Sequence, residues 1–172
     1  MSKPEAKKVS VHELKIRRAA PADSEAISAL LLEAFAPFES HYTSGAFEYT
    51  TPGAEVVESR FVEGPIWVAV KNGSLIGTVS GLPETDRFYI RSMAVKPGLQ
   101  RGGIGQRLLE ELEEYARANG FGRVYLYTTF VLPGARRLYE KNGFTVMRET
   151  LPEEWFDMGG LEMEKELDAI RS

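Results

Sequence analysis

Apolar positions recur along the chain with two different periods, and each period predicts one kind of element. Apolar or alternating runs predict strands at residues 11–18, 66–70, 75–80, 88–95, 124–130, 144–147 and 161–167. Apolar residues at spacings of three and four predict helices that begin at Pro21, at Thr51 and Pro52, at Ile104, and at Pro133. The pattern therefore predicts a mixed α/β domain of about seven strands and about four helices.

The order of these elements predicts how the strands pair. Asn72 and Gly73 favour a tight hairpin turn in which both central residues have positive φ, and residues 83–86 predict a second turn. A helix separates the strands at residues 88–95 and 124–130, so these two should lie parallel, joined by a right-handed crossover. We therefore expect a mostly antiparallel sheet with one parallel pair.

Residues 38–50 combine aromatic and polar side chains without a clear period, which predicts a long loop with room for one helical turn. Loops of this length are commonly functional in compact domains, and the aromatic residues argue against disorder. We therefore expect this segment to form a wall of a substrate site. Its candidate substrate contacts are Glu39, Tyr42 and Glu48, because carboxylates and aromatic rings attract a cationic amine.

Composition narrows the classes of function. The 172 residues, 43% hydrophobic and 27% charged, fit a single domain at residues 11–172 that follows a polar, disordered tail at residues 1–10. A net charge of -4 argues against a general nucleic-acid binder, and no run resembles a membrane span or signal peptide, so we expect a cytoplasmic protein. The chain has no cysteine, and its two histidines, His12 and His41, lie in no ligand motif, so no metal site is expected.

A glycine-rich segment, residues 96–105, joins the strand at residues 88–95 to the helix that begins at Ile104. Gly102, Gly103 and Gly105 lie where the first N–H groups of a helix lack intrahelical partners, which suits a phosphate. The same glycines would equally serve a tight turn that touches no ligand. Farther along the helix, a solvated face is predicted for Glu110, Glu111, Glu113 and Glu114.

Two motifs resemble the GNAT family of acyl-CoA-dependent N-acetyltransferases. The segment from Gln100 to Gly105 is similar to the family's signature of Gln or Arg, two variable residues, Gly, one variable residue, and Gly or Ala. The segment from Leu138 to Phe144 resembles the Leu-Tyr-Glu-Lys-x-Gly-Phe run at the family's last helix. The order of the predicted elements also resembles the GNAT fold.

The resemblance implies a role for each matching residue. Acetyl-CoA would be the cosubstrate, and its pyrophosphate would bind the backbone of Gln100, Arg101, Gly102, Gly103, Ile104 and Gly105. Its pantetheine arm would pair with Met93, Ala94 and Val95, although these residues would equally fit a core without a ligand. Tyr139 occupies the family's general-acid position, and a phenol of ordinary pKa, about 10, suits protonation of the CoA thiolate. The alternative for Tyr139 is a tyrosine that only packs.

The sequence departs from the family pattern at the general base. Many members carry a Glu on the strand before the glycine-rich segment, whereas residues 89–95 contain no carboxylate and Arg91 stands near that position. Leu132 also replaces an Asn that contacts the cofactor in many members. His41 is the first candidate for the base, because histidine ordinarily titrates near pH 6.5. The other candidates are Glu39, Glu48 and Glu84.

The leading hypothesis is an enzyme that transfers an acetyl group from acetyl-CoA to a primary amine by direct attack in a ternary complex. A cysteine-bound acyl intermediate is impossible because the chain has no cysteine. The alternatives are a non-catalytic acyl-CoA-binding sensor or interaction module with the same fold, and a phosphate-binding module unrelated to CoA. The expected partners are acetyl-CoA and an amine, with no nucleic acid and no membrane, and the resemblance makes a homodimer plausible.

Overall fold

A seven-stranded sheet runs through the protein, and the computed structural model describes residues 13–132 and 134–168. The strands are β1 (Lys15–Arg18), β2 (Ile66–Lys71), β3 (Ser74–Pro83), β4 (Phe88–Val95), β5 (Arg123–Thr129), β6 (Thr145–Thr150) and β7 (Gly160–Glu166). The α-helices of the described residues are α1 (Ser24–Phe35), α2 (Ser44–Thr50), α3 (Ala54–Arg60), α4 (Ile104–Ala118) and α5 (Ala135–Lys141). Short 3-10 helices are η1 (Pro21–Asp23), η2 (Ala36–His41) and η3 (Pro152–Glu154). The predicted mixed α/β class is confirmed.

The strands lie in the order β1-β2-β3-β4-β5-β7-β6, and every neighbouring pair is antiparallel except β4 and β5. The predicted parallel pair is therefore confirmed, and it follows from the crossover through α4. The hairpin between β2 and β3 turns at Asn72 and Gly73, with φ of 51° and 76°, as the sequence predicted.

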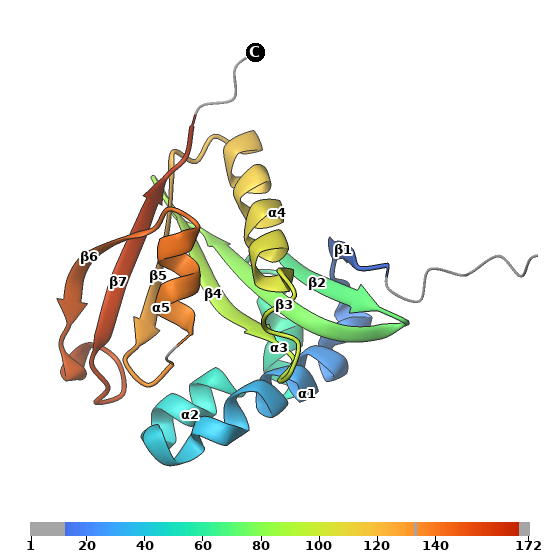
Figure 1. Cartoon of the computed structure of the whole chain (residues 1–172), viewed down its shortest axis with the longest axis horizontal. Helices are drawn as coiled ribbons and strands as arrows, with labels where there is room; N and C mark the ends of the chain where they lie inside the picture. The colour runs from blue at the N-terminus through green and yellow to red at the C-terminus, as the bar shows by residue number, and fades with distance from the viewer. Residues whose placement is uncertain (1–12, 133, 169–172) are drawn as a thin grey trace, which may run out of the picture.

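Helices cover both faces of the sheet (Figure 1). On one face α4 and α5 pack against the strands, and Leu108 and Leu112 of α4 are fully buried there. On the other face α1 and α3 pack through Leu31 and Val57. No helix in the described part of the chain is both long and apolar enough to cross a membrane.

Strands β4 and β5 separate soon after they meet. Their backbones pair only at Phe88 with Val124 and at Tyr89 with Tyr125, at the start of each strand. Farther along, β4 carries a bulge near Ser92, where φ is 54° and the register with β3 shifts. The two strands diverge toward the end of the sheet where α4 begins (Figure 1). On the β5 side, residues 90–95 therefore form an edge that has no partner strand among the described residues, here called the unpaired edge of β4.

Some predicted boundaries are wrong. Residues 38–50 form most of η2 and all of α2 rather than a loop, because the Thr43 hydroxyl caps α2 by accepting a hydrogen bond from Ala46 N at 3.3 Å. The next helix begins at Ala54 and not at Thr51, whose hydroxyl instead donates to a carbonyl of α2. The predicted tail at residues 1–10, residues 11–12 of the predicted first strand, and Pro133 lie outside the described residues.

The prediction of a solvated glutamate face on α4 is wrong at one position. Glu113 is only 4% exposed, and its Oε1 lies 2.7 Å from Nζ of Lys165 on β7. The pairing partner is far away in sequence, so a helical pattern of charges gives no sign of it. This ion pair connects α4 to the β5–β7–β6 side of the sheet.

Candidate functional site

The glycine-rich segment forms a compact turn that presents free backbone N–H groups. Its own hydrogen bonds run from Leu99 N to Lys96 O at 3.0 Å and from Gly102 N to Leu99 O at 3.2 Å. The N–H groups of Gly103, Ile104 and Gly105 have no backbone acceptor in residues 13–132 and 134–168. Since these groups lie at the positive end of the 15-residue helix α4, the turn is suited to bind an anion.

Two of the glycines serve different purposes. Gly103 has φ of 76°, and a Cβ there would meet no atom within 4 Å, so its backbone conformation requires glycine and the space in front of it is open. A Cβ on Gly105 would instead lie 2.9 Å from Met93 Cε and 3.1 Å from Leu138 Cδ2. Gly105 therefore allows α4 to pack closely against β4 and α5, a reason for glycine that involves no ligand.

The predicted cofactor contacts on β4 lie on the unpaired edge. Ala94 pairs with Thr78 of β3 and is buried, whereas Met93 and Val95 are partly buried against the core beneath α4. On the β5 side, the backbone of these residues has no strand partner. An extended molecule that contains amide groups can pair with this edge as an added strand would.

Tyr139 of α5 lies beside the same edge. It is 9% exposed, its ring packs on Phe144, and its hydroxyl donates to Met93 Sδ at 3.8 Å. Burial disfavours the phenolate and raises the pKa of Tyr139 to about 12. The structure thus keeps Tyr139 protonated, but makes it a weaker acid than the ordinary phenol assumed from the sequence.

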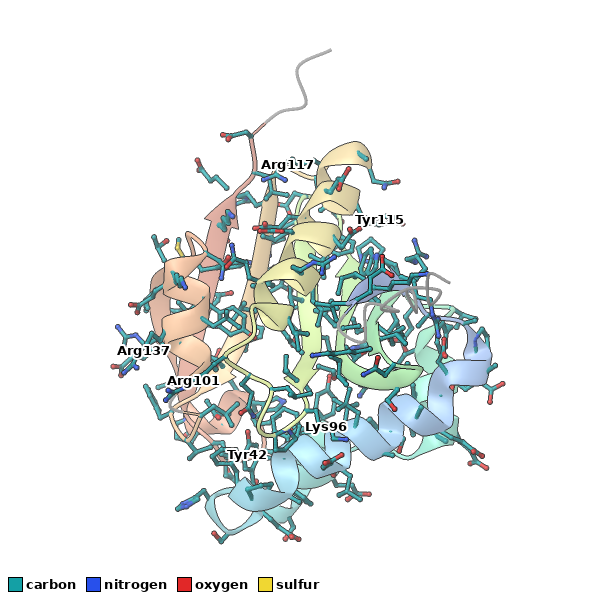
Figure 2. The ribbon with its side chains drawn as sticks, turned by 45° about the vertical axis from the view of Figure 1, so that its right-hand side comes forward. Tyr42, Lys96, Arg101, Tyr115, Arg117 and Arg137 are labelled. Carbon is teal, nitrogen blue, oxygen red and sulfur yellow. The ribbon has the colours of Figure 1, made fainter. Side chains whose placement is uncertain are left out.

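The structure brings together the three predicted substrate contacts. A depression of about 380 Å³ is lined by Glu39, Tyr42 and Glu48, together with Ser44, Phe47 and Thr51. The hydroxyls of Tyr42 and Thr129 are 3.4 Å apart, which links this depression to the end of β5. Figure 2 shows Tyr42, Lys96 and Arg101 toward the same end of the molecule, with Arg117 at the far end of α4.

The predicted bases lie in different places. His41 is exposed at the end of η2, next to Tyr42, but it does not line the depression. Glu84 precedes β4, whereas the glycine-rich turn follows it, so the length of the strand separates the two. Glu84 accepts a 2.6 Å hydrogen bond from the Tyr125 hydroxyl. The structure therefore does not bring Glu84 to the unpaired edge of β4.

Two arginines on the face opposite to α4 were not predicted as site residues. Arg60, the last residue of α3, donates from Nη1 to Ser92 Oγ at 2.9 Å, directly at the bulge of β4. Arg91, which the sequence marked only as the replacement of a carboxylate, bonds from Nη2 to Glu63 at 2.8 Å. These residues are far apart in sequence, and no local motif connects them.

Tyrosines line the adjoining part of this face. Tyr89 of β4 lies 5.1 Å from Tyr125 and 5.9 Å from Tyr127 of β5, measured between ring centroids. Tyr127 is 45% exposed, and its hydroxyl donates to Glu162 of β7 at 3.2 Å. Burial raises the pKa of Tyr89 well above the ordinary value. These phenols are thus neutral groups that can donate hydrogen bonds over a wide pH range.

Comparison with known proteins identifies the family of the chain. Residues 26–144 match the sequence model described as "Acetyltransferase (GNAT) family". The chain is 34% identical over 90 residues to the probable N-acetyltransferase camello of Xenopus tropicalis, covering 50% of this chain and 41% of that protein. It is 35% identical over 86 residues to N-acetylaspartate synthetase of Danio rerio, covering 49% and 30%. The match thus spans less than half the length of either relative.

A solved structure shows the same fold. The PaiA N-acetyltransferase of Thermoplasma acidophilum, determined in complex with coenzyme A, superposes with a TM-score of 0.77. It is 21% identical in sequence, and the superposition covers 90% of this chain and 99% of that one. The order of strands and helices described above is therefore that of a solved acetyltransferase.

Proposed function

Because the chain belongs to the GNAT family of acetyltransferases, we propose that it transfers an acetyl group from acetyl-CoA to a primary amine by direct attack in a ternary complex. The observation that carries this proposal is the unpaired edge of β4, which ends at a turn with free N–H groups. A strand edge for an amide-containing arm and a helix start for a pyrophosphate are adjacent there, which is the arrangement that acetyl-CoA requires.

The donor contacts follow from this arrangement. The backbone from Gln100 to Gly105 would bind the pyrophosphate, and the exposed side chain of Arg101 would add a charged hydrogen bond. Met93 and Val95 would pair with the pantetheine arm through their backbone groups. The sulfur of the thioester would then lie toward Tyr139, whose hydroxyl contacts Met93.

The transfer requires two proton movements. The amine nitrogen attacks the thioester carbonyl carbon, so that a C–N bond forms, the C–S bond breaks, and the CoA thiolate leaves. The amine proton passes to a base, for which His41 is our candidate, and the thiolate takes a proton from Tyr139. Since the pKa of Tyr139 is about 12, well above that of a thiol, this proton transfer is unfavourable by itself, so Tyr139 would first stabilise the developing thiolate through a hydrogen bond and then protonate it.

The names of the relatives do not point to one common acceptor, so they do not define the acceptor of this chain. One relative is named for N-acetylaspartate, and the camello protein only as a probable N-acetyltransferase. We carry over only acetyl transfer to an amine.

A non-catalytic acyl-CoA sensor is the second candidate. The observation that favours it is the lack of a carboxylate along β4, where Arg91 stands instead. Both candidates require acetyl-CoA to bind at the glycine-rich turn, but only the enzyme releases CoA when an amine is added.

Two glycines at opposite ends of α4 provide a matched test. Gly103 and Gly120 have φ of 76° and 84°, and a Cβ at either position would meet no atom within 4 Å. Alanine should cost each about 1 kcal/mol through backbone strain alone. Only Gly103→Ala places a methyl group where the pyrophosphate is proposed to bind, so only this variant should weaken acetyl-CoA binding, by about 5-fold or more.

The readouts are acetyl-CoA affinity, measured by calorimetry, and CoA release, measured with a thiol reagent. The protein gives no background with this reagent because it has no cysteine. Equal loss of affinity in Gly103→Ala and Gly120→Ala would place the donor elsewhere. Tight binding of acetyl-CoA without CoA release across a broad amine panel would favour the sensor.

A further inference from the structure

We infer that the acceptor is a small amine that also carries a carboxylate, and that Arg91, supported by Arg60, binds this carboxylate on the face of β4 opposite to α4. The inference rests on the proposed function and narrows its acceptor to a chemical class, of which free amino acids are the simplest members. It depends on an imbalance of buried charge beside the unpaired edge of β4.

Two buried arginine side chains serve adjacent positions of β4, because Arg60 bonds to Ser92, the residue after Arg91. Arg60 is 5% exposed, and the side chain of Arg91 is 10% exposed. Burial, and then the neighbouring charge of Arg91, lower the pKa of the Arg60 guanidinium, so the two cations are close enough to repel each other. An arginine remains charged in proteins, so both positive charges persist.

The described residues supply only one carboxylate to this pair of cations. Glu63, itself 43% exposed, bonds to Arg91 at 2.8 Å. Arg60 contacts Ser92 Oγ at 2.9 Å and lies 5.6 Å from the centroid of the Tyr49 ring, and neither contact adds a negative charge. A buried cation without a counterion is costly, so the surplus charge suits an anion that residues 13–132 and 134–168 do not provide.

Arg91 also has an unused hydrogen-bond donor. Its Nε is buried, and no acceptor for it exists within residues 13–132 and 134–168. A guanidinium donates in a planar fork, and a carboxylate matches two of these donors at once. An incoming carboxylate could therefore pair with Nε while Glu63 keeps its contact with Nη2.

Water does not account for the surplus charge. A cavity of about 10 Å³ borders Arg60, Ser80 and Ser92, which is room for about one water molecule. Such a water would satisfy the Ser80 hydroxyl, which has no partner in the described part of the chain. It would leave the net charge of the two arginines unchanged.

The position of Arg91 directs this charge toward the proposed reaction centre. Tyr89 and Arg91 are two positions apart on β4 and so project from the same face. Tyr89 belongs to the last residue pair with β5, so Arg91 is the first residue on that face along the unpaired edge. In an amino acid only a few bonds separate the amine from the carboxylate, so an acceptor bound at Arg91 places its nitrogen near the acyl donor.

Aromatic rings border the same place. Tyr49, Tyr89 and Tyr127 come from α2, β4 and β5, and the charges of Arg60 and Arg91 act on Tyr89. Rings that exclude water lower the local dielectric constant, which strengthens a guanidinium–carboxylate pair. These rings would therefore favour the pairing of a compact acid with Arg91.

The test compares acceptors that differ only at the carboxylate. CoA release is measured with L-aspartate, L-phenylalanine and glycine, with their carboxamides, and with phenethylamine, at one pH and salt concentration. We expect kcat/KM for at least one amino acid to exceed that of its amide by about 10-fold or more, because the amide lacks the charge that Arg91 binds. Arg91→Gln should raise KM for the amino acid about 10-fold while changing neither KM for its amide nor the affinity for acetyl-CoA.

Arg117→Gln, at the far end of α4 (Figure 2), is the matched control and should not change KM for the amino acid or for its amide. Equal kcat/KM for an amino acid and its carboxamide would overturn the inference and leave the proposed function intact. An equal loss of kcat/KM for both compounds in Arg91→Gln would do the same. If Arg91→Gln fails to fold, the comparison of acid and amide in the natural protein decides alone. If acetyl-CoA binds and no amine of any class releases CoA, the proposed function fails instead.

Discussion

Removal of the Tyr139 hydroxyl should lower kcat without lowering the free energy of unfolding. This hydroxyl is buried, and its contact is a long 3.8 Å hydrogen bond to the weak acceptor Met93 Sδ. A buried hydroxyl that is poorly satisfied costs about 1–3 kcal/mol of desolvation, so Tyr139→Phe should leave the free energy of unfolding unchanged or raise it by about 1 kcal/mol. The ring packing on Phe144, with centroids 5.7 Å apart, remains.

The effect on turnover should be large despite the unchanged fold. General acids contribute about 10²–10⁴-fold to rate. A donor with a pKa of about 12 transfers its proton less readily than an ordinary phenol, so we expect the lower end, a decrease in kcat of about 100-fold. The affinity for acetyl-CoA should change little, because the hydroxyl acts on the leaving thiolate rather than on the bound thioester.

The assay pairs steady-state CoA release with thermal unfolding. Tyr115→Phe, a tyrosine on α4 that packs against Trp67 and Phe88, is the matched control and should keep its kcat. A kcat for Tyr139→Phe within about threefold of the natural protein would refute the assignment of the general acid. A melting temperature lowered by several degrees would refute the claim that the hydroxyl is poorly satisfied.

Two further predictions concern stability. Burial raises the pKa of Tyr139 to about 12 and also raises the pKa values of Tyr42 and Tyr89. The contribution of these neutral phenols to the free energy of unfolding is therefore fully present below about pH 10 and is lost as the pH rises through the folded-state values. Urea titrations at about pH 8 and about pH 10.5 should show a lower free energy of unfolding at the higher pH. Lys165→Met leaves the Glu113 carboxylate buried without its partner and should cost about 3 kcal/mol, most of which Glu113→Leu in the same chain should restore.

The parts of the fold that depend on local chemistry could be predicted from the sequence. The turn at Asn72 and Gly73 requires positive φ at both positions, and the stripe along α4 follows from spacings of three and four. Helix α2 was missed because seven residues show no clear period, and because its stability comes from distant contacts. Tyr49 of this helix packs on Trp155 and Phe156 of the segment between β6 and β7.

The turn proposed to bind the donor can be recognised in the sequence, whereas the arginines proposed to bind the acceptor cannot, for the same reason. The glycine-rich turn is continuous in sequence, so its free N–H groups and left-handed Gly103 follow from local pattern. Arg60 and Arg91 meet only because α3 packs on the face of β4, and Glu113 is buried only because β7 brings Lys165 to it. Charge pairing across the fold leaves no signal at either position in the sequence.

The two residue pairs between β4 and β5 have a mechanical consequence. They are the only strand pairing between a four-stranded half, β1 to β4, and a three-stranded half, β5, β7 and β6, over the described residues. A donor that adds its amides to the unpaired edge would thus replace the missing part of this connection. The cosubstrate would then stiffen the protein while it is bound, and amide hydrogens of residues 90–95 would exchange with solvent more slowly until CoA leaves.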